Sequence, residues 1–201
     1  FTDEETTRYL LARKAEGAAI TVLEGVMGYY DGLGGVSDRA SSYEIARVTR
    51  TPVILVVDGK GASVSLAAQI KGMLSFREDG RICGILLNRV REGYYGRLKE
   101  LLENECGLPV LGFLPPLSEL ELPSRHLGLV MPEELERFEA WADAAAGAAL
   151  AHVDIEKICR IAADAEWLSA KEPALPRLPR QVRLAGAREE AFPFYYEENL
   201  E

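Results

Sequence analysis

Two carboxylates within one glycine-rich stretch are the side chains of this protein best suited to chemistry. The stretch runs from Ile20 to Gly35, reads ITVLEGVMGYYDGLGG, and places Glu24 and Asp31 seven residues apart. Its apolar residues 20–23 predict a short buried strand. Glu24 is therefore expected where a parallel strand ends, which is the edge at which open α/β sheets hold their ligands.

The chemistry predicted for Glu24 is the binding of Mg²⁺ against nucleotide phosphates, as in P-loop nucleotide hydrolases. A solvated acid at the end of a strand is the simpler alternative. For Asp31, a turn-forming aspartate before a glycine is as good an explanation as a catalytic role. The phosphate-binding motif GxxxxGK[ST] does not occur in the 201 residues. We expect that the first strand and its phosphate loop lie outside this chain.

Polar side chains also follow the next two apolar runs. Residues 52–57 and 82–87 predict strands, the first covered by helices on both faces, and they are followed by Asp58 and Asn88. Asp58 could contact a metal or a substrate amide, or cap the next helix. Asn88 could pair with both the donor and the acceptor edges of a purine, or form an ordinary turn.

Two further pairs of polar residues are candidates for binding a ligand. Ser63 and Ser65 open the next predicted helix and could donate to an anion, although helix capping explains each of them at least as well. Arg125 and His126 lie in the segment 117–132, which we interpret as a functional loop. A lone histidine beside an arginine is more often structural, because a general base needs a partner.

The alternation of strand and helix patterns predicts an α/β fold with a parallel sheet flanked by helices in three layers. A proline-rich linker is expected over 171–180, and residues 181–185 predict a strand beyond it. The predicted strands are 20–23, 52–57, 82–87 and 110–114. The first predicted helix begins at an N-cap Thr2, and the next three are 41–49, 63–76 and 94–105. One or two further helices are predicted over 133–170.

Composition narrows the classes of partner. The 23 Lys and Arg residues against 32 Asp and Glu residues give a net charge of −9, which argues against a nucleic acid or an anionic membrane. The apolar runs are far shorter than the roughly 20 residues of a membrane helix. Cys83, Cys106 and Cys159 are widely spaced and predict reduced thiols in a cytoplasmic protein.

Several motifs together resemble the cobyrinic acid a,c-diamide synthase family. The first is EGVMGYYDG at Glu24, and the others follow in the family's order. They are PVILVVDGKGASVSLAAQI from Pro52, GILLNRV from Gly84, PVLGFLP from Pro109 and LPSRHLGLV from Leu122. The end of the chain, residues 186–201, is similar to the opening of the family's glutamine amidotransferase domain.

The resemblance implies an incomplete ATP-dependent synthetase domain over 1–170, of the dethiobiotin synthetase-like P-loop NTPase type. The linker 171–180 would lead into a truncated amidotransferase domain over 181–201. In this family, ATP and Mg²⁺ phosphorylate a carboxylate of a corrinoid or related tetrapyrrole. Ammonia from the glutaminase domain, which is missing here, then converts the acyl phosphate into an amide in cobalamin biosynthesis.

The resemblance also implies roles for single residues. Glu24 takes the metal role, Asp31 orients the activated carboxylate, and Asn88 with Pro115 contacts the nucleotide. The residues expected on the substrate side are Asp58, Ser63, Ser65, Arg125 and His126. Without the phosphate loop and its lysine, the chain on its own is expected to be inactive.

Three alternatives stay open at this point. A sister enzyme that amidates hydrogenobyrinic acid or a nickel sirohydrochlorin would carry the same motifs. A non-catalytic partitioning-type ATPase of the same superfamily is a second alternative, and an inert scaffold that keeps part of a nucleotide site is a third. A homo-oligomer is compatible with each of them.

Overall fold

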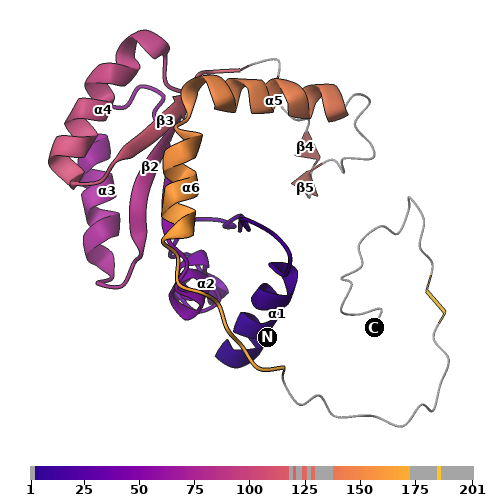
Figure 1. Cartoon of the computed structure of the whole chain (residues 1–201). Coiled ribbons are helices and arrows are strands. Elements are labelled where there is room, and N and C mark those ends of the chain that lie inside the picture. Colours follow the sequence, from indigo (N-terminus) through magenta and orange to yellow (C-terminus); the bar gives the residue numbers. More distant parts are fainter. Residues whose placement is uncertain are drawn as a thin grey trace.

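The computed structural model describes residues 3–117, 120, 124–125, 128–129, 138–172 and 185–186. Its centre is a parallel sheet of three strands, β1 (Val53–Asp58), β2 (Ile82–Asn88) and β3 (Val110–Leu114), in the order β1-β2-β3 (Figure 1). Because neighbouring parallel strands need a crossover between them, each connection carries a helix. The predicted α/β class, with a parallel sheet flanked by helices, is confirmed.

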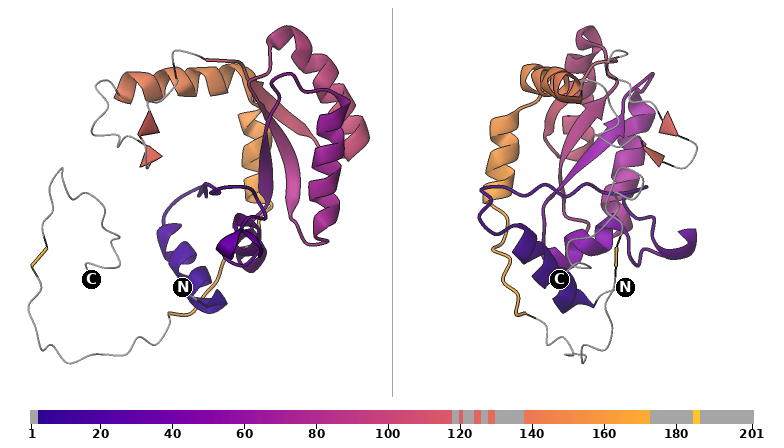
Figure 2. Two further views of the ribbon diagram at one scale, coloured as in Figure 1. Left: turned by 180° about the vertical axis from the view of Figure 1, so that it is seen from behind. Right: turned by 90° about the vertical axis from the view of Figure 1, so that its right-hand side faces the viewer.

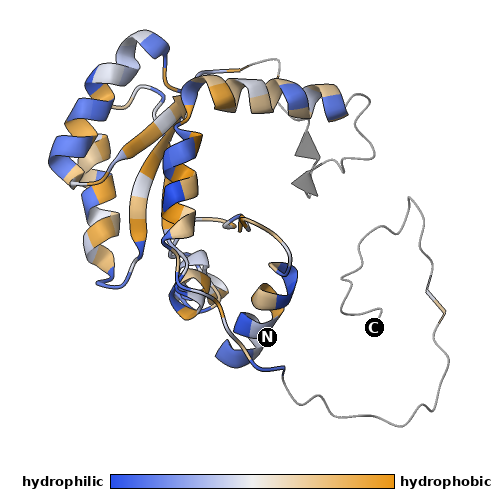
Figure 3. Ribbon diagram, in the orientation of Figure 1, coloured by the Kyte–Doolittle hydropathy of each residue, from blue (hydrophilic) through white to orange (hydrophobic). Residues whose placement is uncertain are grey.

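The two crossover helices, α3 (Val64–Phe76) and α4 (Glu92–Cys106), pack against each other on one face of the sheet. In Figure 3 the strands of the parallel sheet are largely apolar, whereas the helices alternate between polar and apolar residues. This pattern is typical of a sheet enclosed by amphipathic helices. The fully buried side chains of this core are Ile70, Ile85, Leu87, Val90, Leu98 and Leu102.

The other face of the sheet is covered next to β3 by α5 (Phe138–His152) and α6 (Ile155–Ala163), as the turned views show (Figure 2). Where the two helices meet, the backbone N–H of Asp154 donates to the carbonyl of Leu111 at 2.8 Å. Gly112 has a φ of +143°, and a Cβ there would overlap the backbone of His152. The close approach therefore needs glycine.

The predicted helical region over 133–170 is thus found as two helices that pack onto the sheet. The ring of His152 lies 4.7 Å from that of Phe113 on β3, which agrees with a packing role for this histidine.

Two helices from the first part of the chain lie below the sheet in Figure 1, at the end where the strands begin. They are α1 (Glu4–Lys14) and α2 (Ser42–Thr49), and a short 3-10 turn, η1 (Leu33–Gly35), precedes α2. The N-cap of α1 is Asp3, whose Oδ1 accepts from the backbone of Thr6 at 2.7 Å. Thr2, the predicted cap, lies outside the described residues, and Asp3 performs the function expected of it.

Most predicted boundaries agree closely with the structure. The three strands differ from the predicted ranges by one residue at most, and α4 begins two residues earlier than predicted. Regular structure stops after Leu114, as the following prolines indicated. Within the predicted loop, β4 (Ser124–Arg125) and β5 (Gly128–Leu129) form a short antiparallel pair. All but the last residue of the predicted strand 181–185, and most of the linker, lie outside the described residues.

The predicted strand over residues 20–23 is wrong. The segment has no regular secondary structure and pairs with no strand in the described part of the chain, and Ile20, Val22 and Leu23 are 45%, 87% and 44% exposed. An apolar run becomes a strand only when a neighbour satisfies its N–H and C=O groups. The expectation that helices cover both faces of β1 is also wrong, because α5 and α6 contact β3 and leave Val56 60% exposed.

The cysteines agree with the prediction of reduced thiols near the core. Cys83, Cys106 and Cys159 are free and half-buried. Burial raises the pKa of the thiols of Cys83 and Cys106. Among the described helices, none is both long enough and apolar enough to cross a membrane.

Candidate functional site at the carboxyl ends of the strands

The carboxyl ends of the three strands lie at one edge of the sheet. Asp58 at the end of β1 is opposite Asn88 at the end of β2, and Asn88 is opposite Leu114 at the end of β3. Pro115 follows directly. The parallel register therefore brings three of the predicted site residues to one edge, where ligands bind in open α/β sheets.

Asp58 forms an ion pair with Arg89 across the two strand ends. Nε of Arg89 donates to Oδ1 at 2.9 Å, and a terminal guanidinium nitrogen donates to Oδ2. Oδ1 also accepts from the backbone N–H of Lys60 at 3.1 Å. The hydrogen bond from Arg89, followed by that from Lys60, lowers the pKa of Asp58 below its usual value. Asp58 is therefore an ionised carboxylate that Arg89 and the backbone of Lys60 orient.

The side chain of Asn88 is oriented by the backbone that follows it. Its Oδ1 accepts from the N–H of Arg89 at 2.9 Å, and Arg89 has a left-handed backbone with a φ of +59°. Within the part of the chain that the structure describes, Nδ2 of Asn88 has no hydrogen-bond partner. An amide held in this way presents its amino group, which can donate to an acceptor atom of a ligand.

The backbone at this edge is closely packed. The N–H of Gly59 donates to the carbonyl of Asn88 at 2.7 Å, and the N–H of Val90 donates to the carbonyl of Leu114 at 3.1 Å. A Cβ at Gly59 would overlap the side chain of Val90. The loops after β1 and β2 therefore hold each other in place, and the edge is a rigid platform.

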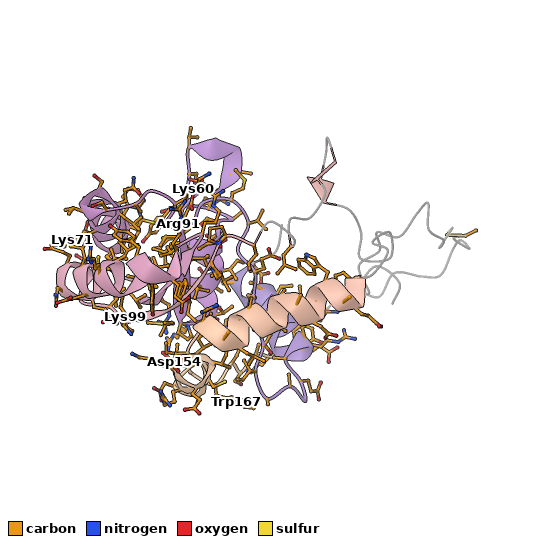
Figure 4. The ribbon with its side chains drawn as sticks, turned by 90° about the horizontal axis from the view of Figure 1, so that it is seen from above. Lys60, Lys71, Arg91, Lys99, Asp154 and Trp167 are labelled. Atoms are coloured by element: carbon orange, nitrogen blue, oxygen red, sulfur yellow. The ribbon has the colours of Figure 1, made fainter. Side chains whose placement is uncertain are left out.

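Ser63 and Ser65 lie at the start of α3, at the same edge of the sheet as Asp58 and Asn88. Ser63 occupies the N-cap position of α3, but its side chain makes no capping hydrogen bond, and both serines are exposed. Helix capping was the alternative to anion binding for these serines, and the structure shows no such capping hydrogen bond. Figure 4 views this end of the molecule from above and labels Lys60 there.

Glu24 and Asp31 have different surroundings. Glu24 is exposed and follows directly after residues 20–23, which were predicted to be a strand. Asp31 closes a tight turn, because its Oδ2 accepts from the N–H of Gly28 at 3.1 Å and its own N–H donates to the carbonyl of Gly28 at 2.9 Å. The turn that was the alternative for Asp31 is therefore present in the structure.

A cluster of three tyrosines anchors the loop that carries Asp31. The rings of Tyr29, Tyr30 and Tyr43 contact one another, with centroids 4.8–6.0 Å apart. The hydroxyl of Tyr29 donates to the carbonyl of Gly80, and that of Tyr43 donates to a carboxylate oxygen of Asp79 at 2.6 Å. Both partners belong to the turn that precedes β2. The loop is therefore attached to the amino end of the sheet.

The structure thus separates the predicted site residues into two groups. β2 has seven residues between the turn that Tyr29 contacts and the far end at Asn88, which corresponds to about 20 Å at the usual rise of a strand. The group at the carboxyl edge comprises Asp58, Ser63, Ser65, Asn88 and Pro115. Glu24 and Asp31 belong to the segment at the amino end, and the side chains of Arg125 and His126 lie outside the described residues.

Two features of this region were not predicted from the sequence. Arg89 was not predicted to pair with Asp58. The sequence did contain a signal for this pair, because an acid follows one predicted strand and a cation follows the next. The anchoring tyrosines gave no such signal, because their partners are backbone carbonyls and an acid far along the chain.

The side chains of this region could supply only a small part of the ligands of a magnesium ion. The described residues contain no group of three or more His, Cys, Asp or Glu side chains that could hold a metal ion. Mg²⁺ bound to a nucleotide usually takes one or two carboxylates, with phosphates and water completing its shell. The exposed carboxylate of Glu24 is a group of the type that provides one such ligand.

Comparisons with known proteins find curated relatives along almost the whole chain. The cobyrinate a,c-diamide synthase of Listeria innocua is 41% identical over 201 residues, covering 99% of this chain and 44% of the relative. That of Priestia megaterium is 39% identical over 204 residues, with the same two coverages. That of Gloeobacter violaceus is 39% identical over 207 residues, covering 100% of this chain and 44% of the relative.

The chain spans less than half the length of these relatives. No family model and no solved structure matches it. The similarity includes the segments that carry Glu24, Asp58 and Asn88, since it covers 99% of the chain. The resemblance to the cobyrinic acid a,c-diamide synthase family is therefore confirmed.

Proposed function

We propose that the complete protein carrying this chain is an ATP- and glutamine-dependent amide ligase that amidates the a and c carboxylates of cobyrinic acid in cobalamin biosynthesis. The observation that supports it most strongly is the similarity to curated cobyrinate a,c-diamide synthases over 99% of the chain. The platform formed by Asp58 and Asn88 lies where an α/β sheet of this kind binds its ligand.

The proposed reaction has two steps. A substrate carboxylate oxygen takes the γ-phosphoryl group of ATP, which gives an acyl phosphate and ADP. Ammonia from a glutaminase domain then attacks the carbonyl carbon, and phosphate leaves. Mg²⁺ would neutralise charge on the phosphates, and Glu24 would hold it once its segment has moved from the amino end toward the carboxyl edge. The Nδ2 amino group of Asn88, beside Pro115, would donate to a ring nitrogen of adenine.

The substrate side is assigned to Asp31, Asp58, Ser63, Ser65, Arg125 and His126. In this structure the tyrosine cluster holds the loop of Asp31 toward the amino end of the sheet. A role for Asp31 at the activated carboxylate therefore requires this loop to move toward the carboxyl edge in the complete enzyme. Tyr29→Phe, which removes one anchor, should then leave amidation intact or raise it.

The assignment of Glu24 is tested in the complete protein with Glu24→Gln, which keeps the shape of the side chain and removes its charge. We expect amidation to fall by about 10² or more, while glutamine hydrolysis alone persists. Glu100→Gln is the matched control, since Glu100 is an exposed acid on α4 far along the chain. Turnover of Glu24→Gln equal to that of the unsubstituted protein would show that the metal role is misassigned.

The substrate is tested by offering cobyrinic acid, hydrogenobyrinic acid and a nickel sirohydrochlorin side by side, with mass spectrometry of the products. Two amidations of cobyrinic acid, at a higher kcat/KM than with the other two, are expected. Preferential amidation of either alternative would move the assignment to a sister enzyme. Nucleotide hydrolysis without any amide product would favour a partitioning-type ATPase.

A further inference from the structure

We propose that Arg89 is a positioning residue of the carboxyl-edge site, which holds the Asp58 carboxylate in a fixed orientation across the ends of β1 and β2. The inference rests on the proposed function, because it concerns the same edge of the sheet. Arg89 has no role among those that the motif resemblance implies.

The first support is the geometry of the pair. Two nitrogens of one guanidinium donate to the two oxygens of one carboxylate, and the residues come from adjacent strand ends. Such a two-pronged contact fixes the plane of the carboxylate as well as its position, which a single lysine nitrogen cannot do.

The second support is the backbone of Arg89. Its φ of +59° lies in the left-handed region, which is costly for an arginine. In this conformation its N–H reaches Oδ1 of Asn88 while its side chain reaches Asp58. One residue therefore fixes both polar side chains that end β1 and β2.

The third support is charge. The chain carries a net charge of −9, and the proposed ligands, a nucleotide triphosphate and a polycarboxylate, are anions. An unpaired Asp58 at this edge would repel them, whereas the pair with Arg89 is neutral overall. Because each partner is about half exposed, solvent limits the size of the effect.

The test uses the complete protein and four variants. Arg89→Gln removes the charge and the two-pronged contact, and Arg89→Lys keeps the charge alone. Asp58→Asn removes the carboxylate, alone and combined with Arg89→Gln. The matched control is Arg91→Gln, which removes a cation two residues further along, at the N-cap position of α4, where no capping side-chain bond exists.

The direct readout is the pKa of the Asp58 carboxyl group, followed by carbon NMR of protein labelled at its aspartates and identified by Asp58→Asn. Arg89→Gln should raise this pKa, Arg89→Lys should raise it less, and Arg91→Gln should leave it unchanged. An Asp58 pKa that does not respond to Arg89→Gln would overturn the proposal.

The functional readout separates positioning from a merely structural role. Arg89→Gln should raise KM for Mg·ATP or for the corrinoid by roughly two- to fivefold, with a smaller change in kcat. Asp58→Asn should raise KM at least as much, and adding it to Arg89→Gln should change KM little further, because the carboxylate that Arg89 orients is then already lost to the site. A rise in KM that Arg91→Gln reproduces, or effects of Arg89→Gln and Asp58→Asn that simply add in the double variant, would contradict the proposal.

The two proposals fail in different ways. An unsubstituted protein that makes no amide overturns the proposed function, whereas the NMR titration still decides whether Arg89 holds Asp58. If the protein makes amide but the pKa of Asp58 does not change in Arg89→Gln, only the positioning role is overturned.

Discussion

Asp58 shows how one residue contributes both to the site and to stability. Its pKa lies below the usual value of 3.8, because Arg89 and the N–H of Lys60 stabilise the ionised form. A lowered folded-state pKa means that the pairing stabilises the fold above about pH 4 and that this contribution disappears as the pH falls through the folded-state value. Acid should therefore weaken the edge of the sheet before it disturbs the apolar core.

We predict that Asp58→Asn loses less stability than the unsubstituted protein when the pH is lowered from 7 to 3. The reason is that the substitution removes the carboxylate that acid would protonate. Thermal unfolding followed by circular dichroism across this range is the measurement, and Asp143→Asn, at an exposed position on α5, is the control. Parallel losses in both variants would contradict the prediction.

The tyrosine cluster should make the stability of the fold fall at high pH, whereas Asp58 makes it fall at low pH. Burial raises the pKa of Tyr29 and Tyr30, and the hydrogen bond to Asp79 raises that of Tyr43. Raised pKa values mean that the neutral forms stabilise the fold below about pH 10, and that stability falls as the pH rises beyond it.

Ultraviolet titration should therefore show these tyrosines ionising together with unfolding of the loop. Tyr29→Phe should weaken the fold by about 1 kcal/mol near neutral pH, since the carbonyl of Gly80 loses its donor. It should also reduce the loss of stability in base. A base transition identical in the variant and the unsubstituted protein would show that the loop is not anchored by this contact.

At the scale of elements, the docking of α5 and α6 on β3 depends on one glycine. Gly112 combines a φ of +143° with close approach of the His152 backbone. Gly112→Ala should destabilise the protein by about 1–3 kcal/mol, because it adds backbone strain and separates the helix junction from the strand. Urea unfolding measures this free energy.

Gly147 supplies a matched control within α5. A Cβ there meets nothing within 4 Å, and the residue lies inside the helix. Gly147→Ala should therefore be neutral or stabilise by up to about 1 kcal/mol. If Gly112→Ala behaved like Gly147→Ala, the junction would not depend on the close approach.

At the scale of the whole molecule, we predict that the 201-residue chain binds Mg·ATP weakly and makes no amide. Triphosphate affinity in this type of fold depends chiefly on the amides and the lysine of a GxxxxGK[ST] loop, which the sequence does not contain. Calorimetry with Mg·ATP measures the affinity. A Kd of about 1 μM or tighter, near −8 kcal/mol, would show that the nucleotide site is elsewhere.

The sequence determined the parts of the fold that local patterns specify. The apolar runs ending at Asp58 and Asn88 predicted β1 and β2 almost to the residue, because a strand buried between helices reads as an uninterrupted apolar segment. Since parallel strands end at one edge, the register of β1 and β2 then places these two side chains opposite each other.

Only the tertiary structure decided where the glycine-rich loop lies and what orients the site. Residues 20–23 have the composition of a strand, but pairing depends on a neighbour that no local pattern reveals. The contacts of Tyr29 with Gly80 and of Arg89 with Asp58 join residues 51 and 31 positions apart. Such contacts arise from the packing of the whole chain, and the sequence by itself names the groups but not their partners.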